Sequence, residues 1–242
     1  MSIDAQTFVE LLRAREAFAA RDVPLTAVIL GDCAFATEWA TGDNRRDLAE
    51  FASRMNLSRV ETLDVAGNPT VRTDITAPLP PALEGAFDLV LDIGTLYWCF
   101  DVAAGWRNCF ALLKPRGLIV HHSAMTGYFG RGYYTFQPRL FRDLYRSSGF
   151  REITIKTRAR KFFEGSSLLR RLLLRLSPPS LAFREVGADA IFVNAADWRG
   201  FRFGPTVGPE APMLPNDAEI LCIARRDTTN AFTPPTLASG GA

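Results

Sequence analysis

Three aspartates stand at or near the ends of apolar runs, where a carboxylate can reach a bound ligand. Asp64 lies near the end of "RVETLDV", Asp74 lies in "PTVRTDI", and Asp92 follows "FDLVL". A carboxylate at a strand end can accept hydrogen bonds from ribose hydroxyls, which suits Asp64, or from an adenine amino group, which suits Asp74. The alternative for any one of them is a turn-forming or helix-capping aspartate.

Glycines accompany two of these runs. "TAVIL" ends at Gly31, which Asp32 follows, and Gly94 and Thr95 come soon after Asp92. A glycine lets the backbone approach a ligand closely, although a plain turn at a strand end is the alternative for Gly94. The patterns G-x-G-x-x-G and G-x-x-x-x-G-K-[ST] do not occur in the sequence. A cofactor held through its pyrophosphate is therefore not expected, and a cofactor without phosphates fits better.

Two histidines, His121 and His122, close the apolar run "GLIVHHS". Successive side chains of a strand point to opposite faces, so we expect one histidine to face the ligand site and the other to point away. Either could act as a general base, because histidine titrates near neutral pH, or could simply form hydrogen bonds at a strand end. The sequence has no G-x-S-x-G, which argues against a serine hydrolase.

Aromatic residues and glycines fill residues 125–136, "MTGYFGRGYYTF". Such a loop could bend over a crevice and present flat rings to a substrate, or its rings could fill the sheet edge. Residues 166–176, "SSLLRRLLLRL", form a basic amphipathic helix pattern. This helix could dock on the core, lie at a subunit contact or rest on an anionic membrane surface.

Composition narrows the class of protein. The charge is nearly balanced, with 28 basic and 26 acidic residues, which gives no support for a nucleic-acid partner. The four cysteines form no C-x-x-C pair and are expected to be reduced thiols in a cytoplasmic protein. No metal site is expected, because the two histidines lack clustered partner ligands. No signal peptide is expected, because the N-terminal stretch has no apolar core, and no membrane-spanning segment is expected, because no apolar run reaches about 18 residues.

Strand-like and helix-like segments alternate along the chain, which predicts a Rossmann-like, doubly wound, mostly parallel α/β sheet with helices on both faces. We expect one domain over residues 1–227, with a helical excursion at about 158–215, and a flexible tail at 228–242. Ligands of such sheets bind at the edge where strands end, so the aspartates, Gly31 and the 121–134 loop should share one crevice. The predicted helices are 4–20, a segment within 43–56, 101–113 and 138–148, and the predicted strands are 26–30, 59–65, 69–75, 87–93, 117–123, 151–159 and 218–226.

The pattern "VETLDV…VRTDITAPLP…FDLVLDIGTLYWCFD…NCFALLKPRGLIVHHS" resembles the class I S-adenosylmethionine-dependent methyltransferases. Together with "GRGYYTFQPRLFRDLYRSSGF", it is similar to a bacterial subgroup that reads roughly "GTLEHVFN" and then "GHGFYQFSPELF". The likeness covers about residues 60–226 and, more loosely, 26–40. The subgroup has a similar glycine-poor turn after its first strand, so a single glycine is compatible with cofactor binding.

The resemblance implies S-adenosylmethionine as the cofactor. Gly31 and Asp32 would then line the methionine end, Asp64 would bind the ribose, Asp74 the adenine edge, and Asp92, Gly94 and Thr95 would form the floor. The chain departs from the subgroup at Tyr97 and Trp98, which replace Glu and His, and at Arg131, which replaces His. These three residues, with Tyr133 and Tyr134, are expected to contact the substrate.

Two functions remain open from the sequence. The first is a methyltransferase that acts on a small molecule or a glycan hydroxyl, with His121 or His122 removing the acceptor proton. The second is a catalytically silent methyltransferase-like domain that binds a partner protein. The retained aspartates favour the first, whereas the single glycine and the Tyr97–Trp98 replacement favour the second. A homo-oligomer is also left open.

Overall fold

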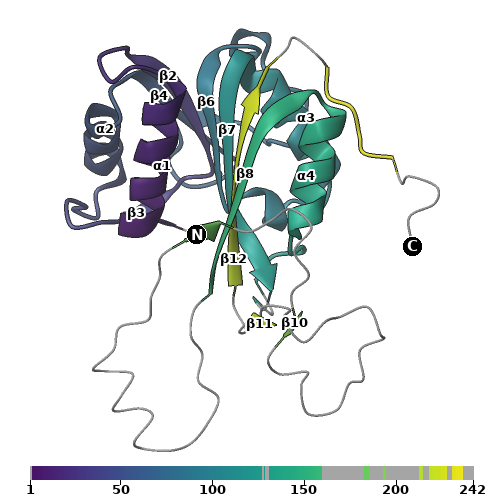
Figure 1. The fold of residues 1–242 in the computed structure, drawn as a ribbon. Coiled ribbons are helices and arrows are strands. Elements are labelled where there is room, and N and C mark those ends of the chain that lie inside the picture. The colour runs from purple at the N-terminus through teal and green to yellow at the C-terminus, as the bar shows by residue number, and fades with distance from the viewer. Residues whose placement is uncertain are drawn as a thin grey trace, which may run out of the picture.

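The structure, a computed structural model, describes residues 2–126, 128, 131–159, 183–185, 193–194, 213–214, 218–227 and 231–236 (Figure 1). Within these residues, eight strands form one sheet in the order β5–β4–β2–β6–β7–β12–β8–β9. The strands from β5 to β7 run parallel to one another, and β12 is antiparallel to both of its neighbours. The predicted Rossmann-like α/β class, with a mostly parallel sheet and helices on both faces, is confirmed.

Among the parallel strands, the central ones β2, β6 and β7 come from apolar runs that are mostly buried on both faces, whereas the outer strands β4 and β5 are more exposed. The parallel strands of this sheet are β2 (Leu25–Leu30), β4 (Leu57–Asp64), β5 (Val71–Arg72), β6 (Phe87–Ile93) and β7 (Leu113–Thr126). The chain leaves β2 outward through β4 and β5, then returns to place β6 on the other side of β2. In sheets of this kind, ligands bind outside the carboxyl ends of the strands where the order reverses. Here that point lies between β2 and β6.

The second half of the chain supplies the antiparallel part of the sheet. β12 (Ala218–Arg226) lies between β7 and β8 (Phe150–Ala159), and β9 (Arg184–Glu185) pairs with β8. Two short parallel pairs lie outside this sheet: β1 (Ser2–Asp4) with β3 (Ala34–Ala36), and β10 (Val193–Asn194) with β11 (Met213–Leu214). The sequence did not predict β1 or β3, since each has only three residues.

Helices cover both faces of the sheet. The helices α1 (Ala5–Phe18) and α2 (Asn44–Arg54) lie on one side, and α3 (Val102–Leu112) and α4 (Pro138–Ser147) lie on the other (Figure 1). Alternate residues of each central strand join two separate apolar cores, so that Ile29 packs towards α1 and α2, whereas Val28 packs towards α3 and α4. Short 3-10 turns, Pro81–Leu83 and η2 (Leu96–Trp98), complete the described helices.

Three expectations concern segments that are described only in part. Inside the expected helical excursion at 158–215, the described segments are the end of β8 and the short strands β9, β10 and β11. The amphipathic segment 166–176 lies outside the described residues. In the expected tail, the described residues 231–236 contact α3 and the end of α4: the Phe232 ring packs against Phe110, and the Thr233 carbonyl accepts the Ser147 hydroxyl at 2.6 Å. No helix among the described residues has the length and apolar character needed to cross a membrane.

Candidate functional site

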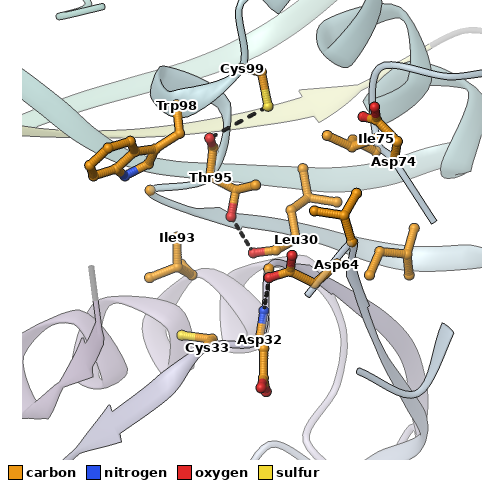
Figure 2. A pocket seen from close by; sticks show the side chains of 14 residues that line it. Leu30, Asp32, Cys33, Asp64, Asp74, Ile75, Ile93, Thr95, Trp98 and Cys99 are labelled. Atoms are coloured by element: carbon orange, nitrogen blue, oxygen red, sulfur yellow. Dashed lines mark hydrogen bonds between the residues drawn. The ribbon is translucent and has the colours of Figure 1, made fainter. Parts of the chain in front are cut away.

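A pocket of about 390 Å³ lies at the carboxyl ends of β2, β4 and β6 (Figure 2). This is the reversal point of the strand order, where the fold favours ligand binding. The pocket brings together six of the seven residues that were expected to bind a cofactor. Its lining consists of Leu30, Gly31, Asp32, Cys33, Leu63, Asp64, Val65, Asp74, Ile75, Ile93, Gly94, Thr95, Trp98 and Cys99.

The Gly31 turn is held tightly at one end of the pocket. Its backbone N–H donates to the Leu63 carbonyl at 2.7 Å, and its φ of +89° lies in the region that glycine favours. A Cβ atom on Gly31 would lie 2.6 Å from the Thr95 hydroxyl oxygen, which itself donates to the Leu30 carbonyl at 2.6 Å. The carboxyl ends of β2 and β6 are therefore fastened together across a position where only glycine fits.

Asp64 occupies the middle of the pocket wall. Its Oδ2 accepts the backbone N–H of Asp32 at 2.7 Å, and its Oδ1 accepts that of Ala66 at 3.1 Å. These donors fix the orientation of a half-buried carboxylate that lines the pocket. The Asp32 carboxylate instead points away from the other labelled side chains in Figure 2 and accepts from Asn68 N and Asn44 Nδ2 at 3.0 and 3.2 Å. Asp32 thus presents mainly its backbone to the pocket.

Asp74 marks the other end of the pocket, beside Ile75 (Figure 2). Its side chain is exposed, and its Oδ1 accepts both the N–H and the hydroxyl of Thr76, at 2.7 and 2.8 Å. Burial raises the pKa of the Cys99 thiol to about 11, and the negative charges of Asp92, Asp74 and Asp64 contribute to this rise. A thiol in the pocket wall therefore senses a negative potential, which favours a positively charged ligand.

The expectation that Asp92 faces this pocket needs correction. Asp92 is completely buried behind the floor. Its Oδ1 accepts the backbone N–H groups of Thr95 and Leu96 at 2.8 and 3.1 Å, and its Oδ2 lies 2.8 Å from His121 Nδ1. The carboxylate supports the Gly94–Thr95 turn from behind the pocket floor. This turn therefore lines the pocket with its own backbone and the Thr95 side chain, and not with the Asp92 carboxylate.

His121 is also not placed to meet a substrate. Its ring is fully buried on the α4 side of the sheet, where Nε2 pairs with the Tyr145 hydroxyl. The interpretation of His121 as a general base is therefore corrected, because both of its ring nitrogens have buried partners. His122 points to the opposite face, as strand alternation requires.

A second pocket, of about 280 Å³, includes His122. Trp98 lines both pockets, so the two cavities meet at this side chain. The lining consists of Ser2, Asp4, Tyr97, Trp98, His122, Tyr128, Arg131, Arg158 and Glu219. Three of the five expected substrate residues, Tyr97, Trp98 and Arg131, are thus brought together beside the first pocket.

A buried charge cluster forms the base of the second pocket. Glu219 accepts from the Tyr128 hydroxyl and from Arg158 Nε, and its Oε2 lies 3.0 Å from His122 Nε2. Arg158 also forms an ion pair with Asp4, with 2.8 Å between Nη1 and Oδ2. Burial alone would raise the pKa of Glu219, but the hydrogen bond and charge of His122, followed by Arg158 and Tyr128, hold this pKa well below its usual value.

The loop after β7 closes one side of the second pocket. The N–H groups of Tyr133 and Tyr134 donate to the Tyr97 carbonyl at 2.8 and 3.1 Å. A Cβ atom on Gly132 would overlap the Tyr97 ring, so this close approach depends on glycine. The Arg131 guanidinium stacks on the Tyr128 ring at 4.2 Å. Tyr133 and Tyr134 do not line either pocket, and they hold the Tyr97 turn in place instead.

Sequence reasoning missed several lining residues. Asp4, Arg158 and Glu219 come from three distant strand ends, and no local motif connects them. The one signal was an acidic residue inside the apolar strand "AEILCIARR", because a buried carboxylate requires partners. Among the described residues, no group of three or more potential ligands is arranged to hold a metal ion.

Neither the known family models nor the curated protein sequences contain a match to this chain. Among solved structures, it is similar to a SAM-dependent methyltransferase from Archaeoglobus fulgidus, with 11% identity, coverage of 90% of this chain and 93% of the other, and a TM-score of 0.50. It is likewise similar to a candidate methyltransferase from Bacillus halodurans C-125, with 12% identity, coverage of 90% and 99%, and a TM-score of 0.50. At these identities the similarity concerns the fold, so the narrower likeness to one bacterial subgroup stays a prediction. The chain has the fold of these methyltransferase structures.

Proposed function

We propose that this chain is an S-adenosylmethionine-dependent methyltransferase that acts on a small molecule. The observation that carries the proposal is the placement of Gly31, Asp64 and Asp74 along one open pocket at the reversal point of the sheet. The Archaeoglobus fulgidus structure, described as SAM-dependent, has the same fold and supports this proposal. An open pocket of this size favours the enzyme over a silent protein-binding domain.

The order of residues along the pocket suits the parts of the cofactor. Asp64 would accept hydrogen bonds from the ribose hydroxyls, since backbone donors already fix its carboxylate. Asp74 and Ile75 would contact the adenine, and the Gly31 turn with Thr95 would contact the methionine part. The negative potential at Cys99 suits the sulfonium and ammonium charges. When bound, the cofactor supplies a methyl group that an acceptor atom takes by in-line displacement.

The second pocket would hold the acceptor, because it meets the first pocket at Trp98. Tyr97 and Trp98 offer flat walls, and Arg131 adds a positive charge at the rim. Positioning two reactants side by side supplies much of the rate in such a displacement. The chain's contribution would then be mainly to orient the acceptor and to exclude water.

The hydrogen bonds of His122 bear on the class of acceptor. His122 Nε2 faces Glu219, and Nδ1 lies 3.4 Å from the Thr7 hydroxyl. Among the described residues of this pocket, the histidine and the carboxylates are thus already paired with one another. We therefore favour an acceptor atom that is ionised or unprotonated at neutral pH, such as the oxygen of an acidic phenol or the nitrogen of an aromatic amine, over an unactivated sugar hydroxyl.

Calorimetric titration tests the cofactor assignment. S-adenosylmethionine and S-adenosylhomocysteine should bind with one site per chain, whereas NAD⁺, whose pyrophosphate has no glycine cradle here, should not bind. Absence of heat with folded protein at high micromolar S-adenosylhomocysteine would refute the proposal.

Methyl transfer to a graded set of acceptors tests the substrate class. Transfer of a labelled methyl group should be faster to acidic phenols than to weakly acidic phenols, and absent with methyl glycosides. For each phenol, the rate should rise with pH as the hydroxyl ionises. Equal transfer to phenols and glycosides would contradict the assignment of the acceptor while leaving the cofactor assignment intact.

A further inference from the structure

A buried chain of hydrogen bonds runs from α4 to the floor of the first pocket. The Tyr145 hydroxyl, on α4, pairs with His121 Nε2, and His121 Nδ1 lies 2.8 Å from Asp92 Oδ2. Asp92 Oδ1 then accepts the backbone N–H groups of Thr95 and Leu96. The side chains of Tyr145, His121 and Asp92 each have no exposed surface, so these three residues cannot touch a ligand in either pocket.

One arrangement of hydrogens satisfies every member of this chain. Burial raises the pKa of Tyr145 well above its usual value, so the hydroxyl keeps its proton and donates to His121 Nε2. His121 Nδ1 then carries the hydrogen and donates to Asp92. The Asp92 carboxylate accepts this bond and two backbone bonds. A fully connected buried network is rigid, whereas a partly connected one is costly.

The network ends at Thr95, a residue that lines the first pocket. The backbone N–H of Thr95 is held by Asp92, and the Thr95 hydroxyl donates to the Leu30 carbonyl across the pocket floor. Figure 2 shows this bond between Thr95 and Leu30 at the centre of the lining residues. A shift of Asp92 would therefore move the Thr95 turn relative to the Gly31 turn.

We propose that His121 is a positioning residue that sets the geometry of the Thr95 turn through Asp92, and that Tyr145 fixes which ring nitrogen of His121 carries the hydrogen. His121 and Tyr145 are not needed merely to fill the core, because apolar side chains of similar size would occupy the same space, but Asp92 would then keep only its two backbone donors. The effect of this network on the pocket is that a residue on α4 helps to fix the backbone that receives the cofactor. Sites hold their geometry when the residues around them are locked by such supporting bonds.

Two substitutions of His121, by side chains of similar shape to each other, distinguish this positioning role from simple packing. In His121→Asn, the amide nitrogen takes the place of Nδ1 and still donates to Asp92. In His121→Leu, a side chain of nearly the same shape lacks any donor. We expect S-adenosylhomocysteine to bind His121→Asn within about threefold of the parent and His121→Leu at least about tenfold more weakly. Phe87→Leu, a buried change at the opposite end of β6, serves as the control for lost stability and should leave binding unchanged.

The binding test rests on the proposed function. A second measurement needs no ligand, so it can distinguish failure of this inference from failure of the proposed function. Hydrogen exchange of the Thr95 and Leu96 amides should be faster in His121→Leu than in His121→Asn and in the parent. If the parent binds no S-adenosylhomocysteine, the proposed function fails and the exchange rates alone decide. Equal exchange in both variants, with equal binding, would overturn the positioning role. Should His121→Leu not fold, His121→Met, which also lacks a donor, replaces it, and unchanged exchange there would have the same meaning.

Discussion

The Thr95 hydroxyl oxygen lies 2.6 Å from the point where a Cβ atom on Gly31 would be. The carboxyl ends of β2 and β6 thus approach each other as closely as the absence of a side chain allows. The hydroxyl also donates to the Leu30 carbonyl, so neither side of this contact can withdraw without losing a hydrogen bond. The proposed methionine end of the pocket depends on this pair of residues.

Gly31→Ala should therefore weaken cofactor binding as well as stability. Gly42→Ala is the matched control, because Gly42 also has a positive φ, +83°, but a Cβ there meets no atom within 4 Å. Both variants should lose about 1–2 kcal/mol of unfolding free energy from backbone strain. Only Gly31→Ala should lose more than this and bind S-adenosylhomocysteine more weakly in calorimetry. Equal behaviour of the two variants would show that the Thr95 contact is unimportant.

Asp64→Asn should weaken S-adenosylhomocysteine binding by about 1–3 kcal/mol, because an amide cannot accept from both the ribose and the Asp32 N–H as a carboxylate does. Asp22→Asn provides the control, since Asp22 is exposed in the turn before β2, away from the pocket. Calorimetric titration of both variants measures the difference. An affinity equal to that of the parent would mean that the ribose lies elsewhere.

The stability of the protein should depend on Glu219 at acidic pH. The pKa of Glu219 is lowered in the folded protein by His122, Arg158 and Tyr128 despite its burial. Because the pKa of Glu219 is lower in the folded protein, its ionised carboxylate stabilises the fold at any pH above its ordinary pKa of 4.5. This stabilisation is lost progressively as the pH falls below 4.5. The parent should therefore lose more unfolding free energy than Glu219→Gln between pH 6 and about pH 3. Urea unfolding of both proteins across this range measures the effect, and parallel curves would argue against the ionised cluster.

Trp98→Ala should lower ligand affinity with little change in stability. The Trp98 side chain is 50% exposed and lines both pockets, so its ring is expected to contribute to binding more than to the core. Phe100→Ala is the control, because Phe100 is 80% exposed and lines neither pocket. We expect a loss of roughly 0.5–1.5 kcal/mol in S-adenosylhomocysteine binding for Trp98→Ala alone. A comparable loss in Phe100→Ala would point to a general effect of the loop.

The apolar runs were sufficient to predict the sheet and its functional edge. Continuous apolar runs such as Ala27–Leu30 and Leu89–Leu91 favour strands covered on both faces, and that pattern is local in the sequence. Once the sheet is parallel, its strand ends share one edge. The sequence pattern alone therefore places Gly31, Asp64 and Asp74 together, and the pocket contains all three.

The sequence could not predict which way the polar side chains at that edge of the sheet point. Strand alternation required His121 and His122 to face opposite sides, but the partners that give each side its chemistry are far away in the chain: Tyr145 on α4 for His121, and Glu219 on β12, 97 positions on, for His122. Asp92 likewise turned towards His121 because the buried imidazole and two backbone N–H groups offered it three donors. The local pattern of apolar residues determined where the strands end, whereas long-range packing decided which of their polar side chains reach the pockets. The reason is that a buried charge is stable only where distant elements bring it a partner.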